Sequence, residues 1–210
     1  MSPLKDEPVA SGPGARPESG LRQVTDARTM RALAHPVRIA LIEALSAGGA
    51  MTATEVAELI GESPTTCSFH LRQLAKYGFV EDSQETRPGR SRPWRMTSIG
   101  MEFRLAGDDP EAEIALLALL RLARERQFAR YRTWLDTRAS YPKAWQDAVG
   151  DSEYTFFITA EELDQLNTEL YKLLINRFKE RRADPSSRPP GSVQVEMLVL
   201  SYPRHLPQPE

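Results

Sequence analysis

The sequence predicts a mainly α fold with a small β component (α+β): a helical domain closed by a β-hairpin, a long helix, and a small C-terminal α/β module. Three observations predict it. Between residues 25 and 76, apolar side chains recur at helical spacing in segments separated by proline, glycine and capping residues. Around residues 79–82 and 94–96 the spacing becomes that of strands. Beyond residue 107, two long helical patterns alternate with short extended ones.

Size and composition favour a soluble cytoplasmic protein with one large domain or two small ones. The 210 residues carry a formal net charge of −2, so nucleic acid would have to be attracted by local basic patches. The one cysteine excludes an internal disulfide and a multi-cysteine metal site, as expected in a reducing compartment. The longest apolar run, Ile114–Leu120, is far shorter than the roughly 20 residues that span a bilayer. We therefore expect neither a membrane span nor a secretory signal.

The first helices are marked by their ends. Residues 1–20, rich in proline, glycine and charge, are expected to be a disordered tail, and residues 21–106 the first domain. A helix is predicted from about Thr25 to the His35–Pro36 step. Pro36 opens a second helix, which stops at Gly48–Gly49.

Two further helices form a helix-turn-helix pattern. Thr52 and Glu55 make a capping box for a short helix, and glycine ends it at residue 61. Ser63 is a good N-cap and Pro64 suits the first helical position of the next helix. A short helix, a brief turn and a second helix is the arrangement that places a recognition helix in DNA.

The helix of residues 63–74 has a face suited to DNA. Cys67, Leu71 and Leu74 form its buried stripe, which leaves short hydroxyls, an aromatic ring, an imidazole and a guanidinium to face outward. Such groups suit base edges and phosphates, whereas solvated faces are usually richer in Glu and Lys. The predicted DNA-binding residues of this segment are Ser63, Thr65, Thr66, Ser68, Phe69, His70 and Arg72. A metal on Cys67 and His70 would lack a third ligand, so core packing is the preferred role of Cys67.

A cationic hairpin follows the recognition helix. Residues 79–82 and 94–96 are predicted strands, and the loop between them contains Arg87, Arg90 and Arg92 with no acid among the three. We expect this wing to contact phosphates. The alternative is an ordinary solvated β-turn, in which arginine is common.

The remaining residues, 107–210, are predicted to hold a dimerisation helix and a strand–helix–strand module. A short helix around Met101 and Phe103 precedes a long helix from about Glu111 to Arg138. Its first half is apolar nearly all round and must be covered on several faces, by a partner subunit or by the C-terminal segment of the same chain. We favour the partner subunit, and hence a homodimer.

The C-terminal module is predicted from two alternating segments that flank a capped helix. Tyr154, Phe156 and Ile158 form the first strand, and a capping box at Thr159 and Glu162 starts the helix. The second strand contains Val193, Val195, Met197 and Val199. An aromatic group could line a small-molecule pocket or pack at a domain or dimer seam, the preferred alternative; its members are Tyr131, Trp134, Tyr141 and Trp145.

These residues resemble a known family. The segment Leu33–Ile42 is similar to the opening of ArsR-type winged-helix transcriptional regulators, and Ser63–Leu74 to their recognition helix. The resemblance covers roughly residues 25–104, and the C-terminal third is similar to an extension of actinobacterial members. It implies a homodimer whose interface lies outside the DNA-reading head. Metal-sensing members carry paired cysteines or Asp/His ligands that this chain lacks, so no metal or cofactor is expected.

Together these features predict a homodimeric, sequence-specific transcriptional regulator, for which we expect repression. The helix of residues 63–74 and the wing of residues 87–92 would read a palindromic operator. The alternative is a winged-helix protein-interaction module, favoured by the near-neutral charge and by Glu81, Asp82 and Glu85 near the wing. A small-molecule effector is compatible with either. No catalytic constellation or phosphate-binding glycine loop is present, so we expect no enzymatic activity.

Overall fold

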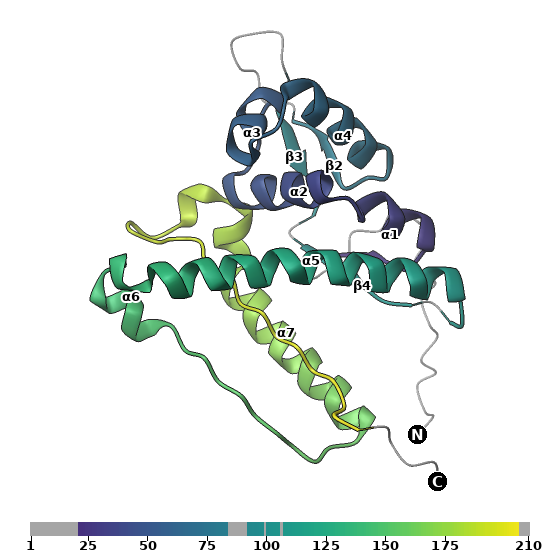
Figure 1. The fold of residues 1–210 in the computed structure, drawn as a ribbon, viewed down its shortest axis with the longest axis vertical. Coiled ribbons are helices and arrows are strands. Elements are labelled where there is room, and N and C mark those ends of the chain that lie inside the picture. Colours follow the sequence, from purple (N-terminus) through teal and green to yellow (C-terminus); the bar gives the residue numbers. More distant parts are fainter. Residues whose placement is uncertain (1–20, 84–91, 99, 106, 206–210) are drawn as a thin grey trace, which may run out of the picture. The chain divides into compact units, whose positions relative to one another are not determined.

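The computed structural model describes residues 21–83, 92–98, 100–105 and 107–205 (Figure 1). The chain divides into two compact units, the first ending at Ala123 and the second beginning at Arg124. The predicted disordered tail, residues 1–20, lies outside the described residues.

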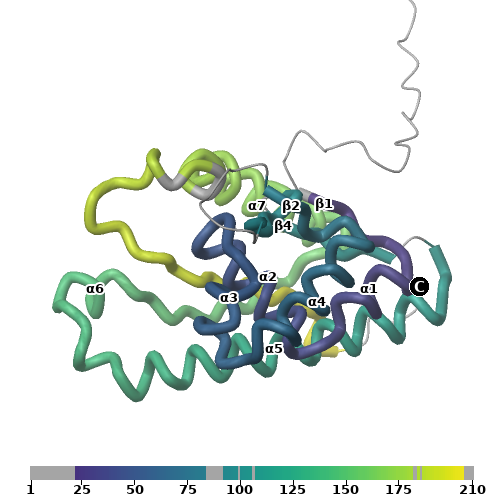
Figure 2. Tube along the Cα trace, turned by 90° about the horizontal axis from the view of Figure 1, so that it is seen from above, coloured from purple at the N-terminus to yellow at the C-terminus, as the bar shows by residue number. Residues whose placement is uncertain are grey.

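The first unit contains the four predicted helices: α1 (Ala27–Leu33), α2 (Pro36–Gly48), α3 (Ala53–Ile60) and α4 (Pro64–Lys76). Their starts confirm the capping predictions. The Thr52 N–H donates to Glu55 Oε2 at 2.7 Å, and the Glu55 N–H donates back to Thr52 Oγ1 at 3.2 Å. The helices α2, α3 and α4 pack on one another (Figure 2).

Two pairs of strands complete this unit. Strands β2 (Val80–Asp82) and β3 (Trp94–Met96) are antiparallel, which confirms the predicted hairpin. Strand β1 (Leu21–Val24) pairs in parallel with β4 (Gly100–Phe103), with Val24 beside Phe103. The predicted short helix around Met101 and Phe103 is therefore wrong. The apolar residues alternate there, and β1 supplies the strand edge that such a segment needs.

The core lies among β1, the four helices α1 to α4, β2 and the first half of α5 (Pro110–Thr137). Its fully buried large side chains include Met30, Leu41, Leu71 and Phe79. Asp109 Oδ1 accepts from the Glu111 and Ala112 N–H groups at 3.0 and 3.2 Å and so caps α5.

The first turns of α5 bury only one face. Ala112, Ala115 and Leu119 pack into the core, whereas Ile114 and Leu117 remain 69% and 43% exposed. The first half of α5, predicted to be apolar nearly all round, thus has one apolar side that the core covers and another that remains exposed. No helix among the described residues is both long and apolar enough to cross a membrane.

The second unit contains the rest of α5, a short α6 (Lys143–Ala148) and α7 (Ala160–Ala183), which starts at the predicted Thr159–Glu162 capping box. The two predicted strands are absent. The segments 151–158 and 193–200 have no ladder partner among the described residues, and Phe156 and Val195 are 62% and 63% exposed. An alternation of apolar and polar residues is not sufficient for a strand. A strand also requires a neighbouring strand whose backbone forms hydrogen bonds with it.

Candidate nucleic-acid interface

The exposed side of α4 is a continuous stripe. Thr65, Phe69, Arg72 and Lys76 follow one another at helical spacing, and all four are exposed, Phe69 to 51%. We call these four residues the α4 stripe. On the opposite side, Cys67, Leu71 and Leu74 are fully buried, as predicted. Sequence reasoning missed Lys76, although its position four residues after Arg72 was the signal that could have found it.

The side-chain hydroxyl groups of Ser63 and Thr66 meet at the N-terminal cap of α4. Ser63 Oγ accepts from the Thr66 N–H at 3.0 Å and lies 2.8 Å from Thr66 Oγ1. Thr66 and Ser68 are half-buried, whereas Ser63 and Thr65 are exposed. The structure therefore leaves Thr65 exposed and gives Ser63 first of all a capping role.

His70 is placed differently from the prediction. Its side chain, predicted to face outward, is only 8% exposed, so that prediction is wrong. Its ring centroid lies 4.5 Å from that of His35 and 5.1 Å from that of Phe69. Burial lowers the pKa of His70, and the neighbouring His35 and Arg38 lower it further.

His35 forms the other half of this ring contact. Its Nδ1 accepts from the Val37 N–H at 3.2 Å and caps α2, at the His35–Pro36 step where the sequence predicts the boundary between two helices. Burial lowers the pKa of His35, and Arg38 adds to that effect, while Glu62 opposes it. Both imidazoles are therefore held toward their neutral forms.

The wing strands pair their acidic residues with arginines. Arg95 lies 2.8 Å from Glu81, and Arg92 lies 3.9 Å from Asp82 across the hairpin. Arg92 is well exposed, and such exposed pairs contribute only about 0–1 kcal/mol, so it can exchange Asp82 for a phosphate at little cost. Arg87 and Arg90, like Glu85, lie outside the described residues.

Cys67 belongs to the core. Its side chain is fully buried, and burial raises the pKa of its thiol. Among the described residues, no group of three or more His, Cys, Asp or Glu side chains is arranged to hold a metal ion. The predicted packing role of Cys67 is confirmed.

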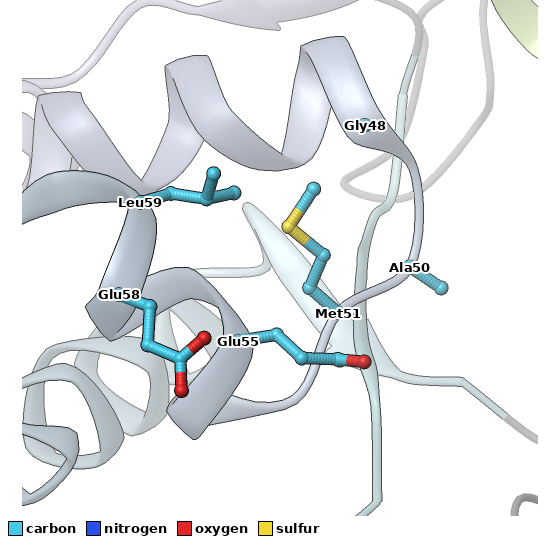
Figure 3. Close-up of a pocket in the computed structure, with 6 residues that line it drawn as sticks. All are labelled: Gly48, Ala50, Met51, Glu55, Glu58 and Leu59. Atoms are coloured by element: carbon cyan, nitrogen blue, oxygen red, sulfur yellow. The ribbon is translucent and has the colours of Figure 1, made fainter.

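A surface cavity of about 430 Å³ lies between the end of α2 and α3 (Figure 3). Its lining comprises Gly48, Ala50, Met51, Glu55, Glu58 and Leu59. The Met51 thioether extends toward Gly48 and Leu59, while two carboxylates form the rim. This apolar floor with an acidic edge would repel phosphate, so the cavity is not part of the nucleic-acid face.

The aromatic group of the second unit packs locally. The Tyr131 and Trp134 rings are stacked with centroids 6.0 Å apart, and the Tyr131 hydroxyl donates to Asp151 at 2.5 Å. That bond raises the pKa of Tyr131. Tyr141 is exposed and Trp145 is half-buried on α6. The stack of Tyr131 on Trp134 accords with packing within this unit.

Comparison with known proteins finds a family that part of the first unit matches. Residues 33–82 match the family model described as a helix-turn-helix domain. Among curated proteins, none matches the chain in sequence.

Two solved structures are similar to parts of it. One is the solution structure of the homodimeric winged helix-turn-helix DNA-binding domain of Mb0332 from Mycobacterium bovis, a possible ArsR-family transcriptional regulator. It is 23% identical, with 50% of this chain and 82% of that chain covered and a TM-score of 0.32. The other is a single-substitution variant of ZitR from Lactococcus lactis, 12% identical, with 78% and 82% covered and a TM-score of 0.26.

The matched residues span α2, α3, α4 and β2, which are the helix-turn-helix and the first strand of the wing. The predicted helix-turn-helix is therefore confirmed by a sequence match and by geometry. Residues 33–82 match a helix-turn-helix domain, and together with β3 they form a winged helix-turn-helix.

Proposed function

We propose that the chain is a homodimeric transcriptional repressor that reads a palindromic DNA operator through α4. The observation that carries this proposal is the α4 stripe. It is the exposed face of the second helix of a helix-turn-helix, and α4 has no acidic residue along its length. A face of hydroxyl, aromatic and basic side chains is suited to the major groove, where an acid would be repelled by phosphate.

Within this proposal, the side chains divide into two roles. Thr65 and Phe69, at the exposed N-terminal end of the stripe, contact base edges, with Thr66 and Ser68 beside them. Arg72, Lys76 and Arg92 contact phosphates, together with the wing arginines at positions 87 and 90. Base contacts set the sequence preference, and phosphate contacts set the salt dependence.

The uncovered face of α5 supports a homodimer. Ile114 and Leu117 are exposed on α5, while the opposite face of the same turns is buried. A second copy that packs on this face would make a two-fold dimer, and two α4 helices would then enter half-sites about 34 Å apart or a multiple of that distance. Occupancy of such an operator over a promoter blocks transcription.

The test is selection of bound duplexes from a random library with the full-length protein. We expect a palindromic motif that Thr65→Ala relaxes at one position of each half-site. Lys172→Ala, a change at an exposed position of α7, is the matched control and should leave the motif intact. Failure of a folded protein to enrich any motif would overturn the proposal.

The exposed Phe69 ring favours one alternative, a protein-interaction module. An apolar side chain exposed on a helix is a suitable anchor for another protein. This alternative predicts no salt-sensitive binding to random duplex even at low ionic strength. A regulator that reads DNA binds such duplexes weakly, with an affinity that falls steeply as salt is added.

A further inference from the structure

A row of three aromatic rings joins the start of α2 to the exposed face of α4. The His35 and His70 rings are 4.5 Å apart, and the His70 and Phe69 rings meet edge-on at 5.1 Å. His35 caps α2, His70 is buried, and Phe69 belongs to the α4 stripe. A change in charge at the buried ring therefore has a short path to a residue placed to meet DNA.

Both imidazoles have a structural reason to stay neutral. His35 Nδ1 accepts the Val37 N–H, so a proton on that nitrogen removes the acceptor that caps α2. His70 Nδ1 is buried and has no hydrogen-bond partner among the described residues. A proton there would bury a charge without a bonded counterion.

The groups around the pair also oppose a second positive charge. Arg38 faces both rings from α2, and each imidazole, once protonated, would repel the other. Among the described residues, Glu62, in the turn before α4, is the acid that acts on both, and burial raises the pKa of the Cys67 thiol. Tyr77, at the end of α4, acts on Arg38 in turn. Guanidinium and burial together outweigh the single carboxylate, because both histidine pKa values are lowered.

We propose that His70 is a positioning residue for DNA recognition: the neutral His35–His70 stack holds Phe69 and the α4 stripe in their reading position, and protonation of the pair releases them. The inference rests on the proposed function of α4. It deepens that function by making DNA binding depend on pH through a residue that does not touch DNA.

The direction of the pH effect follows from linkage. The folded pKa values of both histidines lie below the ordinary value of about 6.5, so the unfolded or released state binds protons first as the solution is acidified. The neutral imidazoles stabilise the folded stack fully above about pH 6.5. This stabilisation is lost as the pH falls below about 6.5 toward the lower pKa values of the folded protein. Non-specific DNA binding changes in the opposite direction, because acid adds positive charge to the protein.

The first arm of the test uses no DNA. Histidine ring signals are followed by NMR in the full-length protein from pH 4.5 to 8, in the wild type and in His35→Asn. Asparagine is a good N-cap, so this variant keeps the start of α2 while it removes the first imidazole. We expect the pKa of His70 to rise in the variant. An unchanged His70 titration would overturn the pairing.

The second arm measures binding to a fluorescent duplex enriched in the library selection, relative to a random-sequence duplex, at pH 7.5 and 5.5 and at constant salt. We expect the wild type and the control His205→Gln to weaken at pH 5.5, by at most about tenfold for each of the two stacked histidines, because pH 5.5 lies about one unit below their ordinary pKa of about 6.5. His70→Phe, which keeps a buried ring but cannot take a proton, should bind as well at pH 5.5 as at pH 7.5.

The outcomes separate the two proposals. Binding at pH 7.5 that does not weaken in acid in the wild type overturns the positioning role of His70 and leaves the proposed function standing. Absence of any preference for the enriched duplex at both values of pH overturns the proposed function, and with it this role. If His70→Phe does not fold, His35→Asn serves in its place and should show a smaller acid-induced weakening than the wild type, because His70 still titrates but with a higher pKa.

Discussion

The guanidinium of Arg22 lies 4.4 Å above the centroid of the Phe79 ring, and its Nη2 donates to the carbonyl of Tyr77 at 2.5 Å. Arg22 belongs to β1, whereas Tyr77 and Phe79 form the exit from α4. One side chain thus fastens the first strand to the end of the recognition helix.

Removal of this contact should destabilise the first unit. Arg22→Ala loses the cation–π contact and a charged hydrogen bond, and we expect the free energy of unfolding to fall by about 1–2 kcal/mol. Arg28→Ala removes an exposed arginine of α1 and should change it by less than about 0.5 kcal/mol. Urea denaturation of both variants measures the difference. Equal effects would show that the Arg22 contact contributes nothing of its own.

Cys67 should be unreactive until the protein unfolds. Its thiol is fully buried and has a raised pKa, so a thiol reagent should label it slowly in native buffer and rapidly in guanidinium. Cys67→Ser should cost about 1–3 kcal/mol, because the new hydroxyl has no ready partner in an apolar site. Cys67→Ala should cost less. Rapid labelling of the native protein would contradict the core role.

The uncovered face of α5 should control assembly. Ile114→Asp places a charge on the exposed apolar face, so we expect the proposed dimer to dissociate while the helical circular dichroism signal is retained. Glu113→Gln, a change at the adjacent exposed position, is the control and should remain dimeric. Sedimentation equilibrium distinguishes the two. A dimer that survives Ile114→Asp would move the interface away from this face.

Arg72 should contribute a salt-dependent, sequence-independent share of DNA binding. Arg72→Ala is expected to weaken all duplexes alike and to reduce the slope of log affinity against log salt by about 1. Lys172→Ala removes one positive charge from α7 and should leave the slope unchanged. Fluorescence anisotropy at several salt concentrations gives both slopes. A loss confined to one sequence would indicate instead that Arg72 reads a base.

The parts of the fold that the sequence predicted well are those fixed by neighbouring residues. Pro36, the Thr52–Glu55 capping box and the Ser63 N-cap each act within one helical turn, so the starts of α2, α3 and α4 could be predicted without tertiary information. The hairpin of β2 and β3 is similarly local.

The wrong predictions all concern residues whose structure depends on contacts with residues distant in the sequence. β4 is a strand because β1, far earlier in the chain, offers it an edge. His70 is buried because the ring of His35, which precedes α2, lies against it, and helical periodicity within α4 cannot reveal that contact. For residues 151–158 and 193–200 the predicted strands are wrong, because a strand requires a paired edge and these segments have none among the described residues.

The parallel pairing of β1 with β4 has a consequence for folding kinetics. These strands are the first and last described elements before α5, so their hydrogen bonds close a loop that contains α1, α2, α3 and α4. The entropy lost on closing so long a loop must be recovered from contacts made beforehand, so the helices should assemble first and the strands join last. Weakening of the β1–β4 pair should therefore accelerate unfolding while leaving the folding rate nearly unchanged.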